Sequence, residues 1–176
     1  TLFYLMLGLI QPQSGGVFFK GVNIFQDLKK WRKEIGYISQ NIFLLDGSIK
    51  KNISFNFVDE KINEEKLEKA VQIAELTDKI SSLEKGLDTQ VGTDGLTFSG
   101  GERQRIAIAR AIYKKPEIFF MDEFTSALDS HTEDNIINNF HKHLPDSTMI
   151  MIAHRKETIK KCDEVWKIEN GRLIKL

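Results

Sequence analysis

The sequence predicts an α/β fold in which a partly parallel sheet is flanked by helices, with an antiparallel β portion and a helical subdomain. The apolar run 118–121 ends in the adjacent carboxylates Asp122 and Glu123, which is typical of a buried parallel strand with acid chemistry at its C-terminal end. Amphipathic helical patterns lie before and after this run. Short apolar segments around Gly-containing turns, near both ends of the chain, predict the antiparallel hairpins.

Length and composition limit the kind of protein. The chain has 176 residues, enough for one domain with its own core. Its formal net charge is zero, so nothing suggests a nucleic-acid partner and we expect none. The lone Cys162 excludes an internal disulfide and fits a reducing compartment. No apolar run in the sequence reaches the length of a membrane span.

The first forty residues contain four expected elements. They are a helix over 1–10, a hairpin of 17–19 with 22–24, a short basic helix capped by Asp27, and a strand over 35–39 that ends in Gln40. The first helix is predicted from a stripe of apolar side chains at Leu2, Leu5, Met6 and Leu9. The hairpin is predicted from the turn that Gly21 permits.

Residues 61–85 are expected to be helical. Leu67, Ala70 and Val71 share one apolar face, and Glu65 precedes Lys69 by four positions, as in a helical ion pair. The charged residues of this segment are interpreted as a solvated face.

A helix is predicted to begin at Ser99, because Ser99 and Glu102 have the spacing of a capping box. Gly100 and Gly101 leave the backbone amides of the first turn bare. A helix start with free amides and a Ser hydroxyl is suited to binding an anion. A capped helix without a ligand is the simpler interpretation of these residues taken alone.

The last third of the chain repeats these patterns. Ser130 and Glu133 have the spacing of a second capping box, and the run 148–153 predicts a buried strand that delivers His154. A closing hairpin is expected around Asn170-Gly171. His141 and His143 are interpreted as surface residues and not as metal ligands, since positions two apart do not share a helical face.

Taken together, these motifs resemble those of ATP-binding cassette (ABC) ATPases, in the same order and over essentially the whole chain. Residues 98–102 resemble the signature motif, and 121–123 resemble the Walker B strand with its catalytic Glu. Residues 126–129 resemble the D-loop, Gln40 the start of the Q-loop and His154 the switch His. The resemblance implies a P-loop NTPase fold of the ABC type and ATP with Mg²⁺ as cofactors.

The resemblance also implies a role for each residue near the strand ends. Asp122 would hold Mg²⁺, usually through water, and the amide of Gln40 would reach Mg²⁺ and the attacking water. Glu123 would orient and deprotonate that water, and His154 would contact the γ-phosphate. A strand that merely ends in polar residues is the alternative for the Asp-Glu pair.

The signature residues are implied to act on a partner's nucleotide. Ser99, Gly100 and Gly101, with Glu102, would bind the γ-phosphate of ATP held by a second ABC ATPase domain in a head-to-tail dimer, expected to be a homodimer. Asp129 would reach across that interface. Glu102 stands where the family usually has Gln, and an acid is favourable in the first turn of a helix.

By the same resemblance, the chain begins where the P-loop motif of the family ends. Thr1 would be the last residue of the P-loop, whose glycines and Lys would precede it, so we expect a truncated domain that hydrolyses no ATP by itself. The expected division is 1–47 and 113–176 for the catalytic core, with 48–112 as the helical subdomain that carries the signature motif.

Two further segments favour an exporter or flippase. Residues 43–53 resemble an exporter-type segment, and 91–95 lie where exporters carry V-G-E-x-G, with Thr93 at the Glu position. The expected partner is therefore a transmembrane domain, in the same or a separate chain, at the cytoplasmic face of the inner cell membrane. A soluble ABC ATPase of translation or DNA repair, and a degenerate cassette that binds without hydrolysis, are the alternatives.

Overall fold

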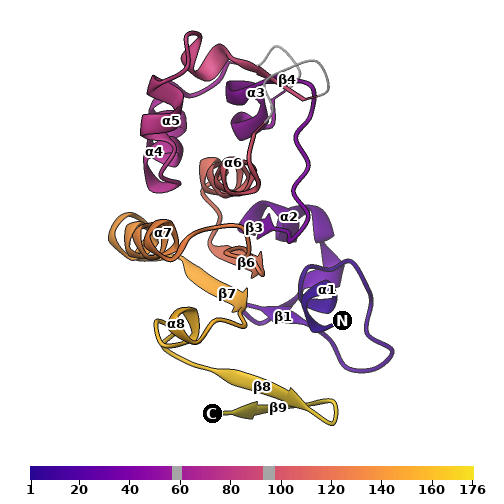
Figure 1. Cartoon of the computed structure of the whole chain (residues 1–176). Helices are drawn as coiled ribbons and strands as arrows, with labels where there is room; N and C mark the ends of the chain where they lie inside the picture. The colour runs from indigo at the N-terminus through magenta and orange to yellow at the C-terminus, as the bar shows by residue number, and fades with distance from the viewer. Residues whose placement is uncertain (57–60, 93–97) are drawn as a thin grey trace.

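A three-stranded parallel sheet lies at the centre of the computed structural model, which describes residues 1–56, 61–92 and 98–176 (Figure 1). Its strands, in spatial order, are β3 (Ile35–Ile38), β6 (Ile118–Asp122) and β7 (Thr148–Ile152). Both pairings are parallel, with Phe120 of β6 opposite Tyr37 on one side and Ile150 on the other. The carboxyl ends of all three strands therefore meet at one edge of the sheet.

The central strand is more deeply buried than its neighbour β7. β6 is the central strand, and its Phe119, Phe120 and Met121 are buried, as the apolar run predicts. β7 was predicted to be buried as well, and this is wrong, because Thr148 is exposed and the rest of the strand is only half-buried. Among the described residues β7 pairs with β6 alone and so forms an edge of the sheet.

One face of the sheet is covered by the N-terminal elements α1 (Leu2–Met6), η1 (Ile24–Gln26) and α2 (Leu28–Glu34). Phe3 packs edge-on against Phe120, with 5.5 Å between ring centroids. Asp27 caps α2 as predicted, accepting a hydrogen bond from the backbone N–H of Lys30 at 2.9 Å. Trp31 of α2 is buried in the same cluster.

The first helix is shorter than predicted. It ends at Met6 instead of residue 10, and Leu9, expected in the buried stripe, is 62% exposed. Gly8 has a φ of +70°, a left-handed conformation that stops the helix, and a Cβ there would lie 2.7 Å from the Leu28 side chain. The indole of Trp31 donates a hydrogen bond of 3.0 Å to the carbonyl oxygen of Met6, which satisfies the early end.

On the opposite side of the sheet, several helices share the larger hydrophobic core. They are α3 (Ile49–Ser54), α4 (Glu64–Ile73), α5 (Thr77–Ser81), α6 (Gly100–Tyr113) and α7 (Ser130–His143). α4 and α5 confirm the predicted helical character of residues 61–85, and α6 begins at the predicted capping box. In Figure 1, α3, α4 and α5 lie at the end of the molecule away from the C-terminal hairpin, with α6 between them and the sheet.

The antiparallel portions are short. The hairpin of β1 (Phe18–Phe19) with β2 (Val22–Asn23) and that of β8 (Trp166–Glu169) with β9 (Arg172–Lys175) are both confirmed. A third antiparallel pair joins β4 (Gly47–Ser48) to β5 (Gln90–Val91), next to η2 (Gly86–Asp88). The segment 91–95, predicted to correspond to V-G-E-x-G, is described only at positions 91 and 92. Thr93 and the two residues after it lie outside the described residues.

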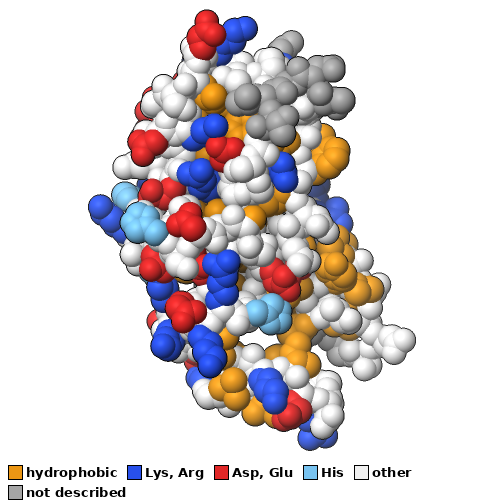
Figure 2. Space-filling model, viewed as in Figure 1, with side chains coloured by type: hydrophobic (Ala, Val, Ile, Leu, Met, Phe, Trp, Pro, Cys, Tyr) orange, Lys and Arg blue, Asp and Glu red, His pale blue; other side chains and the backbone are white. Residues whose placement is uncertain are grey.

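Charges of both signs are interspersed on the surface over α4, α7 and the short α8 (Lys156–Ile159), as Figure 2 shows. This mixture agrees with the formal net charge of zero. Within 1–56, 61–92 and 98–176, the structure has no helix with the length and apolar character of a membrane span.

Candidate functional site

The turn after β6 places Glu123 at the edge where the parallel strands end. Glu123 has a φ of +47°, a left-handed conformation that is rare and costly for a residue with a side chain. Its N–H donates to the carbonyl oxygen of Ile152 at 3.2 Å, and its own carbonyl accepts from the N–H of Ser126 at 3.1 Å. These two bonds hold the strained turn and fix the direction of the Glu123 side chain.

Glu123 lies between two of the predicted site residues. Gln40, two residues after β3, donates from Nε2 to Oε2 of Glu123 at 2.7 Å. The Nε2 atom of His154, two residues after β7, lies 3.1 Å from Oε1 of Glu123. The structure thus brings together side chains that are 83 and 31 positions apart in the chain. We call Gln40, Asp122, Glu123 and His154 the Glu123 cluster.

Asp122 is the last residue of β6, and its charge affects the pKa of a side chain on the neighbouring strand β3. Burial raises the pKa of Tyr37 on β3, and the negative charge of Asp122 raises it further. Tyr37 therefore stays protonated over the physiological range, and Asp122 supplies a negative charge at the strand ends.

The Glu123 cluster fits a magnesium ion by the chemistry of its donors. Mg²⁺ prefers oxygen ligands and is commonly held by one or two carboxylates together with substrate phosphates and water. Asp122 offers a carboxylate, and Gln40, whose Nε2 faces Glu123, keeps its amide oxygen for another partner. Across the described ranges, no group of three or more His, Cys, Asp or Glu side chains is placed to hold a metal.

A second group of predicted residues lies at the start of α6. The capping box is confirmed: Ser99 Oγ accepts from the N–H of Glu102 at 3.2 Å, and the Ser99 N–H donates to Oε2 of Glu102 at 2.8 Å. A cavity of about 410 Å³ opens beside this helix start. We call it the Ser99 cavity; its lining is Ser99, Gly100, Gly101, Glu102, Arg105, Ala127, Leu128, Asp129 and Thr132.

Glu102 carries a charge that another helix compensates. Burial raises its pKa, but hydrogen bonds from Lys79 and Ser99 outweigh burial, so the pKa of Glu102 lies below its ordinary value. The ammonium of Lys79 lies 2.8 Å from Oε1 of Glu102. The interpretation of the charges in 61–85 as a solvated face is therefore wrong for Lys79, which reaches the signature segment.

The loop 126–129 packs against the start of α6. Gln104 is buried and accepts at Oε1 from the N–H of Ala127 at 3.1 Å. Gly101 faces the carbonyl oxygen of Ala127, where a Cβ would lie only 2.9 Å away. Asp129 follows in this loop and lines the Ser99 cavity.

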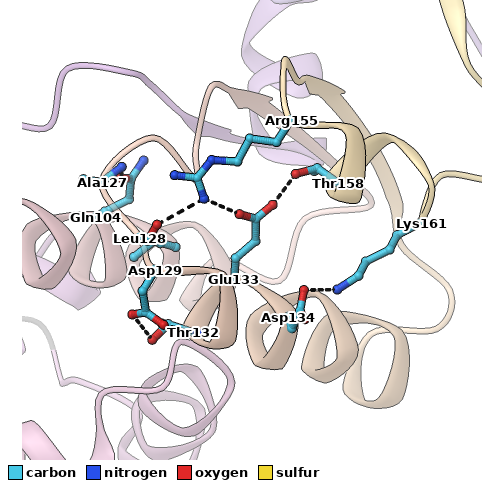
Figure 3. Close-up of polar contacts among 10 residues, drawn as sticks. All are labelled: Gln104, Ala127, Leu128, Asp129, Thr132, Glu133, Asp134, Arg155, Thr158 and Lys161. Carbon is cyan, nitrogen blue, oxygen red and sulfur yellow. Dashed lines mark hydrogen bonds and ion pairs between the residues drawn. The ribbon is translucent and has the colours of Figure 1, made fainter.

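The predicted capping box of Ser130 with Glu133 is wrong. The N-cap of α7 is Asp129, whose carboxylate accepts from the N–H and the hydroxyl of Thr132 at 2.9 and 2.7 Å (Figure 3). These bonds hold the pKa of Asp129 below its ordinary value. Glu133 instead turns inward, is buried, and pairs with Arg155.

The structure brings the predicted residues Gln40, Glu123 and His154 together, but the side chains that position the two groups were not predicted in that role. These side chains are Lys79, Gln104, Glu133, Arg155 and Thr158, of which Glu133 was predicted only as a capping residue. Arg155 directly follows His154, and Gln104 lies two residues after the signature segment 98–102, so nearness to a predicted motif was the available signal. Thr1, also predicted, lies before α1 as its N-cap residue without a side-chain cap bond, and belongs to neither group.

Comparison with known proteins gives one family. A family model described as ABC transporter matches residues 1–126. The mitochondrial iron-sulfur clusters transporter ABCB7 of Oryzias latipes is 38% identical over 174 residues, which cover 98% of this chain and 23% of that protein. The ATP-dependent lipid A-core flippase of Pectobacterium atrosepticum is 38% identical over 175 residues, which cover 99% of this chain and 30% of that protein.

A solved structure agrees with these relatives. The structure of a bacterial Atm1-family ABC exporter with ATP bound superposes with a TM-score of 0.90 at 34% sequence identity. The match covers 98% of this chain and 30% of the exporter chain. The chain thus spans less than a third of the length of each of these three proteins.

Proposed function

The chain belongs to the ABC transporter family, and from this premise we propose that it binds and hydrolyses ATP to power an exporter or flippase. The relatives are named as transporters and a flippase, which favours this function over a soluble ATPase of translation or DNA repair. The proposed partners are a transmembrane domain and a second ABC ATPase domain, at the cytoplasmic face of a membrane. Residues 1–47 and 113–176 would form the catalytic core, with 48–112 as the helical subdomain.

The position of Glu123 is the observation that carries the proposal. Its carboxylate is held between Gln40 and His154 at the edge where parallel strands end. A carboxylate fixed in this way can orient a water molecule and accept its proton. Each carboxylate oxygen has two lone pairs, so it can accept a hydrogen bond from a neighbouring side chain with one and the proton of the water with the other. Glu123 would be the general base, and His154 would contact the γ-phosphate.

Asp122 and Gln40 would hold Mg²⁺ through oxygen atoms. When bound, the ion would neutralise the developing charge on the transferred phosphoryl group. Asp122 fits this role because it ends β6 directly beside Glu123 and offers the carboxylate oxygens that Mg²⁺ prefers.

The Ser99 cavity would receive the ATP that a partner domain holds. Bare amides of the first turn of α6 and the Ser99 hydroxyl suit a phosphate group. Asp129 lies on the same cavity and would reach across the interface. Closure of the dimer on ATP and opening after hydrolysis would follow, because ATP would bind the closed state better.

Substitution of the proposed base tests this function in the full-length protein. Glu123→Gln keeps the shape of the side chain and its contact with His154 but cannot accept a proton, so we expect ATP turnover to fall by about 10² to 10⁴ while an ATP-bound dimer accumulates. Glu117→Gln is the matched control, because Glu117 is an exposed carboxylate just before the same strand. Near-normal turnover by Glu123→Gln would mean that Glu123 is not the base.

A further inference from the structure

A buried carboxylate links α7 to the segment after β7. The Glu133 side chain is only 4% exposed, and its two oxygens have separate partners. Arg155 Nη1 lies 2.7 Å from Oε2, and the hydroxyl of Thr158 donates to Oε1 (Figure 3). Since a buried charge is costly unless it is paired and hydrogen-bonded, this arrangement fixes the guanidinium of Arg155 firmly.

The same guanidinium nitrogen reaches the loop before α7. Arg155 Nη1 also donates to the carbonyl oxygen of Leu128 at 3.1 Å, as Figure 3 shows. The two bonds differ in strength, because the one to Glu133 joins opposite charges and the one to Leu128 has a neutral acceptor. A displacement of Arg155 would therefore break the Leu128 bond first.

Arg155 stands between the two parts of the candidate site. His154 directly precedes it and contacts Glu123 at 3.1 Å. Leu128, its other partner, lines the Ser99 cavity together with Ala127 and Asp129. Arg155 thus joins the backbone next to His154 to the wall of the Ser99 cavity, in addition to the bond that Ser126 of the same loop makes with Glu123.

We propose that Arg155 is a positioning residue that couples the Glu123 cluster to the Ser99 cavity through the Leu128 carbonyl. The inference rests on the function proposed above. When His154 shifts as the γ-phosphate is lost, the backbone at 154–155 moves, the bond to Leu128 breaks, and loop 126–129 leaves the position that suits a partner's nucleotide. Hydrolysis at one nucleotide would thereby weaken the grip on the other.

Two other contacts of the same region provide matched controls. Lys161 and Asp134 form an ion pair that also ties α7 to the segment after β7, but it does not touch loop 126–129 (Figure 3). Thr158 binds the same Glu133 carboxylate as Arg155 without contacting Leu128. Lys161→Met therefore controls for a lost ion pair, and Thr158→Val controls for a weakened Glu133 network.

The test compares Arg155→Gln, Arg155→Lys and the two controls in the full-length protein. We expect Arg155→Gln to lower kcat about tenfold and to bring the Hill coefficient for ATP toward one, because loop 126–129 no longer keeps the position that suits a partner's nucleotide. Arg155→Lys should restore thermal stability, since an ammonium can pair with the buried Glu133 carboxylate, but not kcat, because the lysine side chain ends about one bond short of Nη1 and the stronger attraction of Glu133 holds it away from the Leu128 carbonyl. Lys161→Met should behave as the wild type does.

The outcomes separate the inference from the proposed function. If Arg155→Gln matches Lys161→Met in kcat and Hill coefficient, the coupling is overturned while the ATPase function stands. If Thr158→Val loses as much kcat as Arg155→Gln at equal loss of thermal stability, the effect is general destabilisation and the coupling is again overturned. If the wild type neither binds nor hydrolyses ATP, the proposed function fails, and the coupling fails with it.

Discussion

A side-chain carbon at Gly101 would lie 2.9 Å from the carbonyl oxygen of Ala127. Real Cβ contacts are longer, and a backbone oxygen cannot swing aside as the end of a flexible side chain can. At Gly100, a Cβ would lie 3.4 Å from the Cβ of Ala127, close to an ordinary contact. The packing of loop 126–129 on α6 therefore requires glycine at 101 more strongly than at 100.

Gly101→Ala is expected to lower the free energy of unfolding by about 1 to 3 kcal/mol, the usual cost of overpacking. Gly100→Ala should lower the free energy of unfolding much less, because alanine has a higher helix propensity than glycine and the contact with the Cβ of Ala127 can relax. Urea denaturation of both variants checks the difference. Equal losses at the two positions would show that the approach to Ala127 is not the cause.

The ion pair of Lys79 with Glu102 predicts a pH dependence. The pKa of Glu102 is lowered in the folded protein, so the pair stabilises the fold above the ordinary pKa of glutamate and loses this effect as the pH falls through the lower, folded value. We expect Glu102→Gln to lower the free energy of unfolding by about 1 kcal/mol at neutral pH. The difference from the wild type should vanish in acid.

Lys50 and Glu64 provide the control for that experiment. They form a similar ion pair, but Glu64 is well exposed. Loss of this ion pair should therefore lower the free energy of unfolding less at any pH. Lys79→Met should reproduce the neutral-pH loss of Glu102→Gln, whereas Lys50→Met should not. A constant difference between wild type and Glu102→Gln down to strongly acid pH would contradict the lowered pKa.

Elements with their own local signals could be predicted from the sequence. The Asp27 cap, the Ser99–Glu102 capping box and the apolar run of β6 each depend on neighbours within a few positions. The end of the first helix could not be predicted, because it depends on Gly8 meeting Leu28 of another element. Hydrophobic periodicity continues past that point, and tertiary contact overrides it.

In the candidate site, too, some features could be predicted from the sequence and others could not. Gln40, Glu123 and His154 each follow a parallel strand, and strand ends of one sheet meet at one edge, so their meeting follows from the fold. The roles of Glu133 and Asp129 could not be assigned in this way. Both Asp129 and Ser130 are good N-caps, and only the burial of Glu133 against Arg155 decides between them.

His154→Ala is expected to lower kcat by about 10² to 10³, since a group that contacts the transferred phosphoryl charge is lost. Nucleotide binding should change less than kcat, because a contact with the γ-phosphate strengthens as charge develops on the transferred group. His141→Ala is the control, being an exposed histidine at the end of α7. A rise in KM without a change in kcat would contradict a role in the chemical step.

Gln40→Glu places a second carboxylate against Glu123, at the position where an amide now donates at 2.7 Å. Like charges at this distance disfavour ionisation of the pair, so we expect part of the Glu123 base to be protonated at neutral pH. Turnover should therefore fall about tenfold or more and recover as the pH is raised. Gln40→Ala serves as the comparison, since it should lower turnover without this alkaline recovery.

Asp129 combines a structural and a proposed interface role, and two substitutions can separate them. Asp129→Ala removes the N-cap of α7 and should lower the free energy of unfolding. Asp129→Asn keeps an oxygen that accepts from the N–H of Thr132, so stability should stay near that of the wild type while the charge is lost. Thermal unfolding checks both expectations.

The separation becomes informative when ATP-driven dimerisation is measured by light scattering in the Glu123→Gln background. If the Asp129 charge acts across the interface, Asp129→Asn should weaken dimerisation about tenfold although the fold is intact. If Asp129→Asn dimerises normally and only Asp129→Ala fails, Asp129 serves the dimer solely by holding the first turn of α7. In that case the wall of the Ser99 cavity depends on helix capping, and the proposed contact across the interface is wrong.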